Sequence, residues 1–164
     1  MMEMLRRLND VELAGYIRYR TANRMTARPE YGAAVEESGR RHGQGLAFPA
    51  TIALVREAGQ AGRFIAYGEL AKRSGVPWVK ARRVVFDHLG QLCQLAHGRG
   101  WPLLSCLFVN QQHVETGHME ASSLKGFVAT ARSLHVPVAN ASAFLKEQQE
   151  LTFAWARGQA EGAG

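Results

Sequence analysis

The fold is decided by residues 64–97, which read F-I-A-Y-G-E-L-A-K-R-S-G-V-P-W-V-K-A-R-R-V-V-F-D-H-L-G-Q-L-C-Q-L-A-H. The β-prone start of this stretch leads into a short helix predicted over residues 68–74. Gly75 is expected to end that helix, because only glycine adopts the left-handed conformation there without steric cost. Pro77 suits the first turn of a second helix, predicted over residues 77–97. Two helices joined by a glycine turn predict a helix-turn-helix motif.

The second predicted helix is basic near its start, where Lys80, Arg82 and Arg83 fall close together. The formal net charge of the chain is +6, and residues 46–99 hold eight Lys or Arg against three Asp or Glu. A basic excess over a helix-turn-helix is the charge distribution that phosphate binding requires. The sequence therefore predicts a nucleic-acid-binding protein with duplex DNA as its partner, and the alternative is an ordinary solvated surface.

The residues predicted to contact nucleic acid lie in or beside the motif. They are Arg63, Tyr67, Arg73, Trp78, Lys80, Arg82 and Arg83. Two of them have a structural alternative: Tyr67 can fill the core where strand meets helix, and Trp78 can hold the two helices together. Arg82 and Arg83 point about 100° apart on a helix, so at most one of them is expected to lie centrally in a groove.

The predicted fold class is mainly α with a small β-sheet (α+β), a winged helix-turn-helix core with extra N- and C-terminal helices. We expect a single domain over residues 1–158, with the helix-turn-helix core at about 48–118 and a disordered tail at 159–164. Asn9 begins the first helix with a capping box, and Asn140 caps the last. The flanking helices are predicted at residues 9–26, 122–134 and 140–157.

Two other segments are predicted from their Gly and Pro positions and from their hydropathy. Residues 28–47 contain Pro29 and four glycines, and read as an irregular connection around a possible short helix at residues 33–38. Residues 103–109 are almost continuously apolar and read as a buried strand. A turn followed by a second short strand at residues 113–116 would complete a small wing.

Three short segments, in order, carry a resemblance to a known family. Residues 62–71 read G-R-F-I-A-Y-G-E-L-A, residues 81–84 read A-R-R-V, and residues 105–110 read S-C-L-F-V-N. They resemble the DNA-binding domain of the alkylguanine-DNA alkyltransferases and of their catalytically silent alkyltransferase-like relatives. The corresponding family segments read G-x-V-x-T-Y-G-x-I-A, A-R-x-V-G and P-C-H-R-V.

The resemblance implies roles for three residues. Tyr67 resembles the tyrosine that rotates the phosphate of a target nucleotide, and Arg82 resembles the arginine that enters the duplex where the base is flipped. Cys106 falls where the family has its nucleophile, or the replacement residue of the silent relatives. Leu107 and Phe108 stand where the family has His and Arg, so this chain lacks the polar neighbours that keep a cysteine as thiolate.

Cys106 is therefore expected to be a buried, neutral thiol that packs as a small hydrophobe. The sequence gives no positive argument for an enzyme, and alkyl transfer by Cys106 ranks third among the functions considered. His113, Glu115 and His118 form weak candidates for a metal site, since alternation along a strand would bring them together. No cysteine supports them, and we expect neither a metal nor a cofactor.

The runner-up function is a protein–protein interaction or assembly domain on a winged-helix scaffold, with a homodimer through the terminal helices. The aromatic residues behind this alternative are Tyr16, Tyr19, Phe144, Phe153 and Trp155. Two cysteines without a close pair fit a reducing cytoplasm. The N-terminus has no apolar core of a signal peptide, and the longest apolar run is far too short to span a bilayer. We therefore expect a cytoplasmic protein that does not enter membranes.

Overall fold

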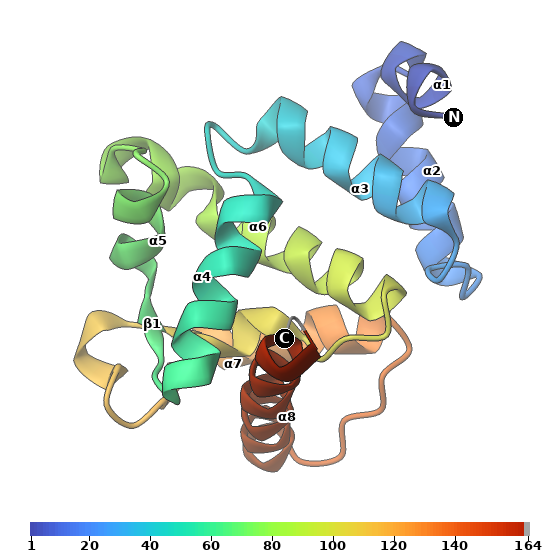
Figure 1. Cartoon of the computed structure of the whole chain (residues 1–164). Helices are drawn as coiled ribbons and strands as arrows, with labels where there is room; N and C mark the ends of the chain where they lie inside the picture. The colour runs from blue at the N-terminus through green and yellow to red at the C-terminus, as the bar shows by residue number, and fades with distance from the viewer. Residues whose placement is uncertain (163–164) are drawn as a thin grey trace.

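The computed structural model describes the backbone of residues 1–162 and the side chains of residues 1–158. Within them the chain forms eight α-helices and one tiny sheet (Figure 1). The helices are α1 (Met2–Arg7), α2 (Asp10–Ala22), α3 (Pro29–His42), α4 (Phe48–Ala61), α5 (Tyr67–Arg73), α6 (Trp78–Gly98), α7 (Ala121–Ser133) and α8 (Ala141–Gly162). The mainly helical class with a small sheet is thus confirmed.

The two helices of the central motif form as the sequence predicts. α5 ends at a turn in which Gly75 has φ +68°, a left-handed conformation that glycine adopts without strain. α6 follows directly, with Pro77 as the residue before its first turn. The α5–turn–α6 unit follows α4, whose C-cap residue, Gly62, is also left-handed.

The sheet differs from the predicted wing. β1 (Ile65–Ala66) pairs in parallel with β2 (Phe108–Val109), and no hairpin is present within residues 1–162. Most of the predicted strand at 103–109 is instead a 3-10 turn, η1 (Leu104–Leu107). These apolar side chains are buried on every side, which a short turn wedged among helices permits as well as a strand does.

The predicted second strand at residues 113–116 is also wrong. The chain there forms the 3-10 turn η2 (Gln111–His113) and further turns that end at Gly117. Gly117 has φ +75°, and Phe64 packs so closely on it that an added Cβ would overlap the ring. The segment folds back against Phe64 and has no neighbouring strand within residues 1–162 with which to pair.

The segment predicted as an irregular connection is the 14-residue helix α3. Pro29 begins it, in the position where proline suits a helix. One of its two glycines serves packing, because a Cβ on Gly39 would lie 2.7 Å from the Phe48 ring. Glycine here marks close approach between helices rather than a break in the helix.

The flanking helices agree with the prediction in type and differ at their ends. The Asn9 capping box is present, with reciprocal 2.8 Å hydrogen bonds to Glu12, but α2 stops at Ala22 instead of residue 26. Asn140 caps α8 by accepting a hydrogen bond from the Ala143 amide. The predicted end of the last helix at residue 157 is wrong, since α8 continues to Gly162. The predicted disordered tail therefore begins inside a helix, and residues 163–164 lie outside the described part of the chain.

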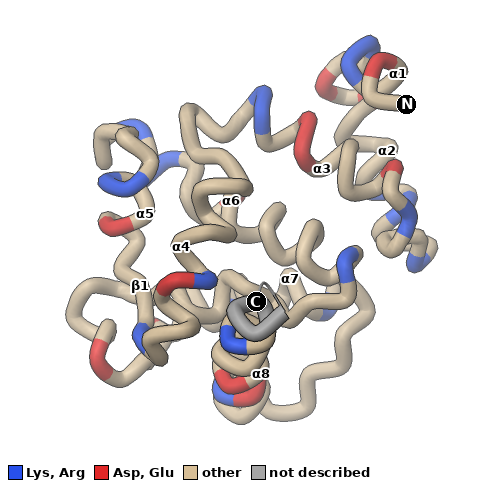
Figure 2. The backbone as a smooth tube through the Cα atoms, in the orientation of Figure 1, with Lys and Arg blue, Asp and Glu red and all other residues tan. Residues whose placement is uncertain are grey.

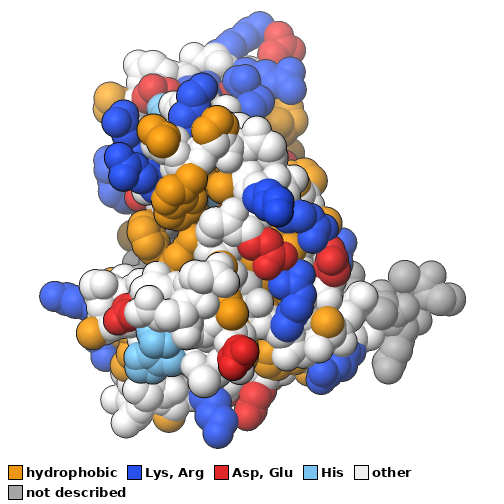
Figure 3. Space-filling view, turned by 90° about the vertical axis from the view of Figure 1, so that its left-hand side faces the viewer, with side chains coloured by type: hydrophobic (Ala, Val, Ile, Leu, Met, Phe, Trp, Pro, Cys, Tyr) orange, Lys and Arg blue, Asp and Glu red, His pale blue; other side chains and the backbone are white. Residues whose placement is uncertain are grey.

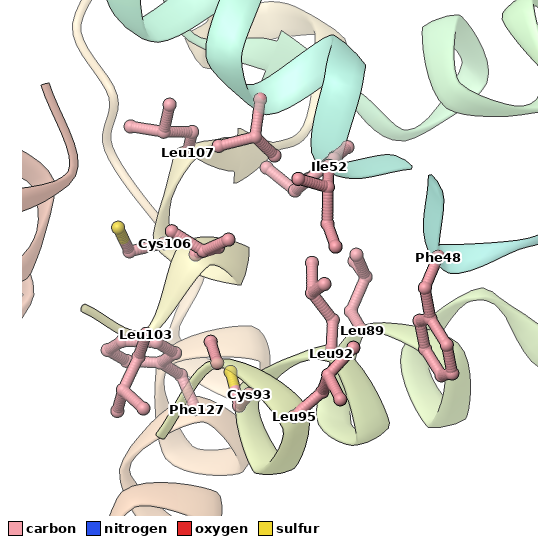
Figure 4. Close-up of a cluster of buried hydrophobic side chains, with 14 of the residues drawn as sticks. Phe48, Ile52, Leu89, Leu92, Cys93, Leu95, Leu103, Cys106, Leu107 and Phe127 are labelled. Carbon is pink, nitrogen blue, oxygen red and sulfur yellow. The ribbon is translucent and has the colours of Figure 1, made fainter. Parts of the chain in front are cut away.

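The hydrophobic core draws on helices from both ends of the chain. Figure 4 shows part of it, where side chains from α4, α6, α7 and the η1 segment lie together. α8 packs along α4 and covers η1, so the C-terminal helix closes the core beside the central motif. Within residues 1–162, no helix combines the length and the apolar character that a membrane crossing demands.

A charge cluster around the buried Glu37 carboxylate connects α1 to α3. The Glu37 carboxylate, 1% exposed, accepts hydrogen bonds from Arg40 at 2.7 and 3.0 Å and from Arg41 at 3.0 Å. Arg41 also donates to the backbone carbonyls of Leu5 and Arg6 in α1. The hydrogen bonds from Arg40 lower the pKa of Glu37 to about 2, although burial alone would raise it.

Glu37→Gln is expected to lower the free energy of unfolding by about 2 kcal/mol at neutral pH, because charge-assisted hydrogen bonds are lost. The folded pKa lies below the ordinary value, so this stabilisation is full above the ordinary Glu pKa and is lost as the pH falls toward 2. Urea unfolding of both proteins across this range measures it. A difference that stays constant down to acidic pH would show that the carboxylate charge has no part.

Candidate nucleic-acid interface

The start of α6 presents three basic side chains to solvent. Lys80, Arg82 and Arg83 are exposed, and none of their side chains forms an ion pair or hydrogen bond with another described residue. Figure 2 shows the Lys and Arg positions near α5 and the first part of α6, on the side away from α1 and α2. Ala81 and Val85 are buried and fix the opposite face of the helix to the core. The three cations are therefore held on a rigid helix.

Two other arginines of the predicted interface are engaged with carboxylates. Arg63 donates to both oxygens of Glu69, at 2.9 and 3.0 Å, and lies 3.9 Å from Glu57. Arg73 donates to Glu57, and this hydrogen bond lowers the pKa of the Glu57 carboxyl. The charge of Arg63 and Arg73 is thus partly neutralised within the protein, which sequence spacing alone did not reveal.

The candidate interface has one buried aromatic residue, Tyr67, and two exposed ones, Trp78 and Phe86. Tyr67 is 8% exposed and begins α5, and burial raises the pKa of its hydroxyl, partly offset by a hydrogen bond with Ser123. Phe86 meets the Tyr67 ring edge-on at 5.1 Å and is itself 57% exposed. Trp78 is 45% exposed, next to the exposed Val79. Figure 3, which faces the α5 side, shows hydrophobic side chains between groups of Lys and Arg.

A pocket opens beside this surface, between α6 and α7. Its volume is about 390 Å³. It is lined by Tyr67, Phe86, Asp87, Leu89, Gly90, Cys93, Ser105, Phe108, Met119, Ser122, Ser123, Gly126, Phe127 and Thr130. No motif in the sequence indicated this pocket. Gly90 and Gly126 are the residues that could have indicated it, because both lie inside predicted helices. Glycine has a low helix propensity, so its presence there suggests a packing or functional role.

Cys106 is buried as predicted, with no exposed surface. Its sulfur lies 3.2 Å from the Thr152 hydroxyl of α8, and burial raises the pKa of the thiol far above its ordinary value. The cysteine that lines the pocket is Cys93, whose sulfur lies 3.0 Å from Ser105. Burial raises the pKa of Cys93 to about 11, so this thiol too is protonated at neutral pH.

Native Cys106 is expected to resist alkylation, because a buried neutral thiol is a poor nucleophile. Cys106→Ala should leave nucleic-acid binding unchanged and lower the free energy of unfolding by about 1 kcal/mol. Labelling with iodoacetamide, located by mass spectrometry before and after unfolding in urea, measures the reactivity. Rapid stoichiometric labelling of native Cys106 would contradict this expectation and restore alkyl transfer as a candidate activity.

The histidines after β2 lie close together without forming a metal site. His113 contacts the Glu120 carboxylate at 2.9 Å, and its ring meets the edge of the His118 ring. Glu115, the third residue of the predicted set, is exposed on the following turn. Among the described residues, no group of three or more His, Cys, Asp or Glu side chains is arranged to hold a metal ion.

No family model, no curated protein and no solved structure matches this chain. The candidate interface therefore rests on its geometry alone. That geometry combines three exposed cations on α6, two exposed aromatic side chains beside them and an adjoining pocket.

Proposed function

We propose that the protein binds duplex DNA through the exposed face of α6, without catalysis, as a regulator or as a sensor of DNA structure or lesions. The observation that carries the proposal is the placement of Lys80, Arg82 and Arg83. They extend from the second helix of a helix-turn-helix, and their charges are not neutralised by carboxylates of the described residues. The second helix of this motif is the one that such proteins lay in a DNA groove.

The proposal includes the alkyltransferase-like architecture, with the parallel β1–β2 pair in place of a wing. Three placements support it. Tyr67 begins α5, Arg82 is exposed on α6, and Cys106 lies just before β2. Because residues 1–162 contain no hairpin, contacts to the phosphate backbone fall to the first turns of α6.

A protein–protein interface is the second candidate, and the exposed Trp78, Val79 and Phe86 favour it. The predicted dimer through the terminal helices has less support. Phe144 is buried, and Phe153 and Trp155 pack partly against the core, so these side chains of α8 are used inside the protein. Tyr19 remains exposed on α2.

Fluorescence anisotropy with a labelled duplex, over a range of salt concentrations, tests the DNA proposal. Each neutralised phosphate contributes a slope of about −0.9 to log K against log salt, so three contacts give a slope of about −2.7. Undetectable binding at low ionic strength, or binding that does not respond to salt, would exclude this function. A dimer that buries Trp78 and Phe86 would favour the second candidate.

A further inference from the structure

We propose that the pocket between α6 and α7 binds a planar heteroaromatic ring that carries an exocyclic amino group or a positive charge, and that Asp87 selects it. The inference deepens the proposed function, because the pocket adjoins the basic face of α6. It can nevertheless be tested independently of that function, since a free ring can bind whether or not the protein binds DNA.

The walls of the pocket suit a flat apolar ring. Five large apolar side chains line it, namely Phe86, Leu89, Phe108, Met119 and Phe127. Binding pockets for small molecules are mostly apolar with a few placed polar groups, and begin at about 300 Å³, a size that this pocket exceeds. Phe86 offers an exposed ring at the opening, where stacking on a heterocycle is favourable.

The charge of the pocket favours hydrogen-bond donors and cations. Its titratable lining residues are Tyr67, Asp87 and Cys93, and no Lys, Arg or His is among the described residues that line it. The Tyr67 hydroxyl and the Cys93 thiol are neutral at physiological pH, because burial raises both pKa values. Asp87 is an exposed carboxylate and forms no ion pair with a described residue. At neutral pH it is therefore the group that an amino or cationic ligand would meet.

Two glycines keep the pocket open. A Cβ added to Gly90 of α6 would meet only the Thr130 hydroxyl, at 4.0 Å, and one added to Gly126 of α7 would meet nothing within 4 Å. The fold therefore does not require glycine at either position to avoid a clash. A bulky side chain at Gly90 would fill the pocket and leave the helices in place.

The ring could reach the pocket as a free small molecule or as a base within nucleic acid. Arg82 and Arg83 lie four and three residues before Phe86, so they share its side of α6 within one turn. A nucleic-acid backbone held by these arginines would have a base within reach of the opening. The chemistry of the ring is the same in both cases.

Calorimetric titration with three free nucleosides tests the inference: 1-methyladenosine, which is cationic at neutral pH, adenosine, which has a neutral amino group, and inosine, which has none. We expect affinity to fall in that order. Asp87→Asn should weaken 1-methyladenosine binding about five- to tenfold and leave inosine unchanged. Gly90→Leu should abolish binding of all three while thermal unfolding stays cooperative. Glu147→Gln, an exposed change on α8 away from the pocket, is the matched control.

A second arm compares DNA duplexes with and without one unpaired adenine. If the unpaired adenine raises the affinity for the duplex and Asp87→Asn removes that increase, the ligand is a base in nucleic acid. If nucleosides bind and the unpaired adenine does not raise the affinity, the ligand is a free small molecule. Nucleoside binding without any DNA binding retains the pocket and rejects the proposed function. The inference is overturned if no nucleoside binds and the unpaired adenine does not raise the duplex affinity. It is also overturned if the wild type and Asp87→Asn bind these ligands equally well.

Discussion

Replacing Arg82 and Arg83 together by alanine is expected to lower the affinity for duplex DNA about 100-fold at moderate ionic strength. Each guanidinium is expected to make a charge-assisted hydrogen bond to phosphate, and such bonds contribute about 1.5 kcal/mol or more each. Both side chains are exposed and have no carboxylate partner among the described residues, so their loss removes attraction without releasing an internal ion pair. The salt slope should become shallower by about two contacts, from about −2.7 to about −0.9.

Arg63→Ala and Arg73→Ala together provide the matched control, because they remove the same charge from the neighbouring surface. Those two arginines are held by Glu57 and Glu69, and their replacement should change DNA affinity less than about threefold. Anisotropy titrations of both double variants, with unfolding curves to verify the fold, make the comparison. Equal losses in the two double variants would show that only net charge matters and that α6 is not the contact.

The parts of the fold that depend on local chemistry could be predicted from the sequence. The Asn9 capping box, the Asn140 cap and the left-handed Gly75 each depend on residues within a few positions, and all three are present. Local residue patterns also predicted the short α5, the long α6 and the burial of Cys106.

The parts that depend on distant contacts could not be predicted. The glycines of α3 indicate a loop when the sequence is considered alone, yet Gly39 is small because Phe48 of α4 lies against it. Apolar residues at 104–107 are as compatible with a strand as with the 3-10 turn that η1 adopts. The pairing of Arg63 with Glu69 and the pocket beside Phe86 depend on how α5, α6 and α7 meet, and no sequence spacing specifies that.

The close approach of α4 and α8 at Gly59 gives the second large expected effect. Gly59→Val should lower the free energy of unfolding by about 3 kcal/mol, because overpacking forces two rigid helices apart. A Cβ at Gly59 would lie 2.5 Å from the Cβ of Ala156, which is completely buried and has no flexible end that could move aside. Urea denaturation followed by circular dichroism measures the shift.

Gly90→Ala is the control for this change, because it also replaces a glycine inside a helix, but at a position where the new Cβ meets only an ordinary contact. Alanine is favoured over glycine there by about 0.5–1 kcal/mol, so this variant should be more stable than the wild type. Opposite signs for the two substitutions would separate helix propensity from helix packing. An unchanged unfolding midpoint for Gly59→Val would mean that α8 does not lie on α4 this closely.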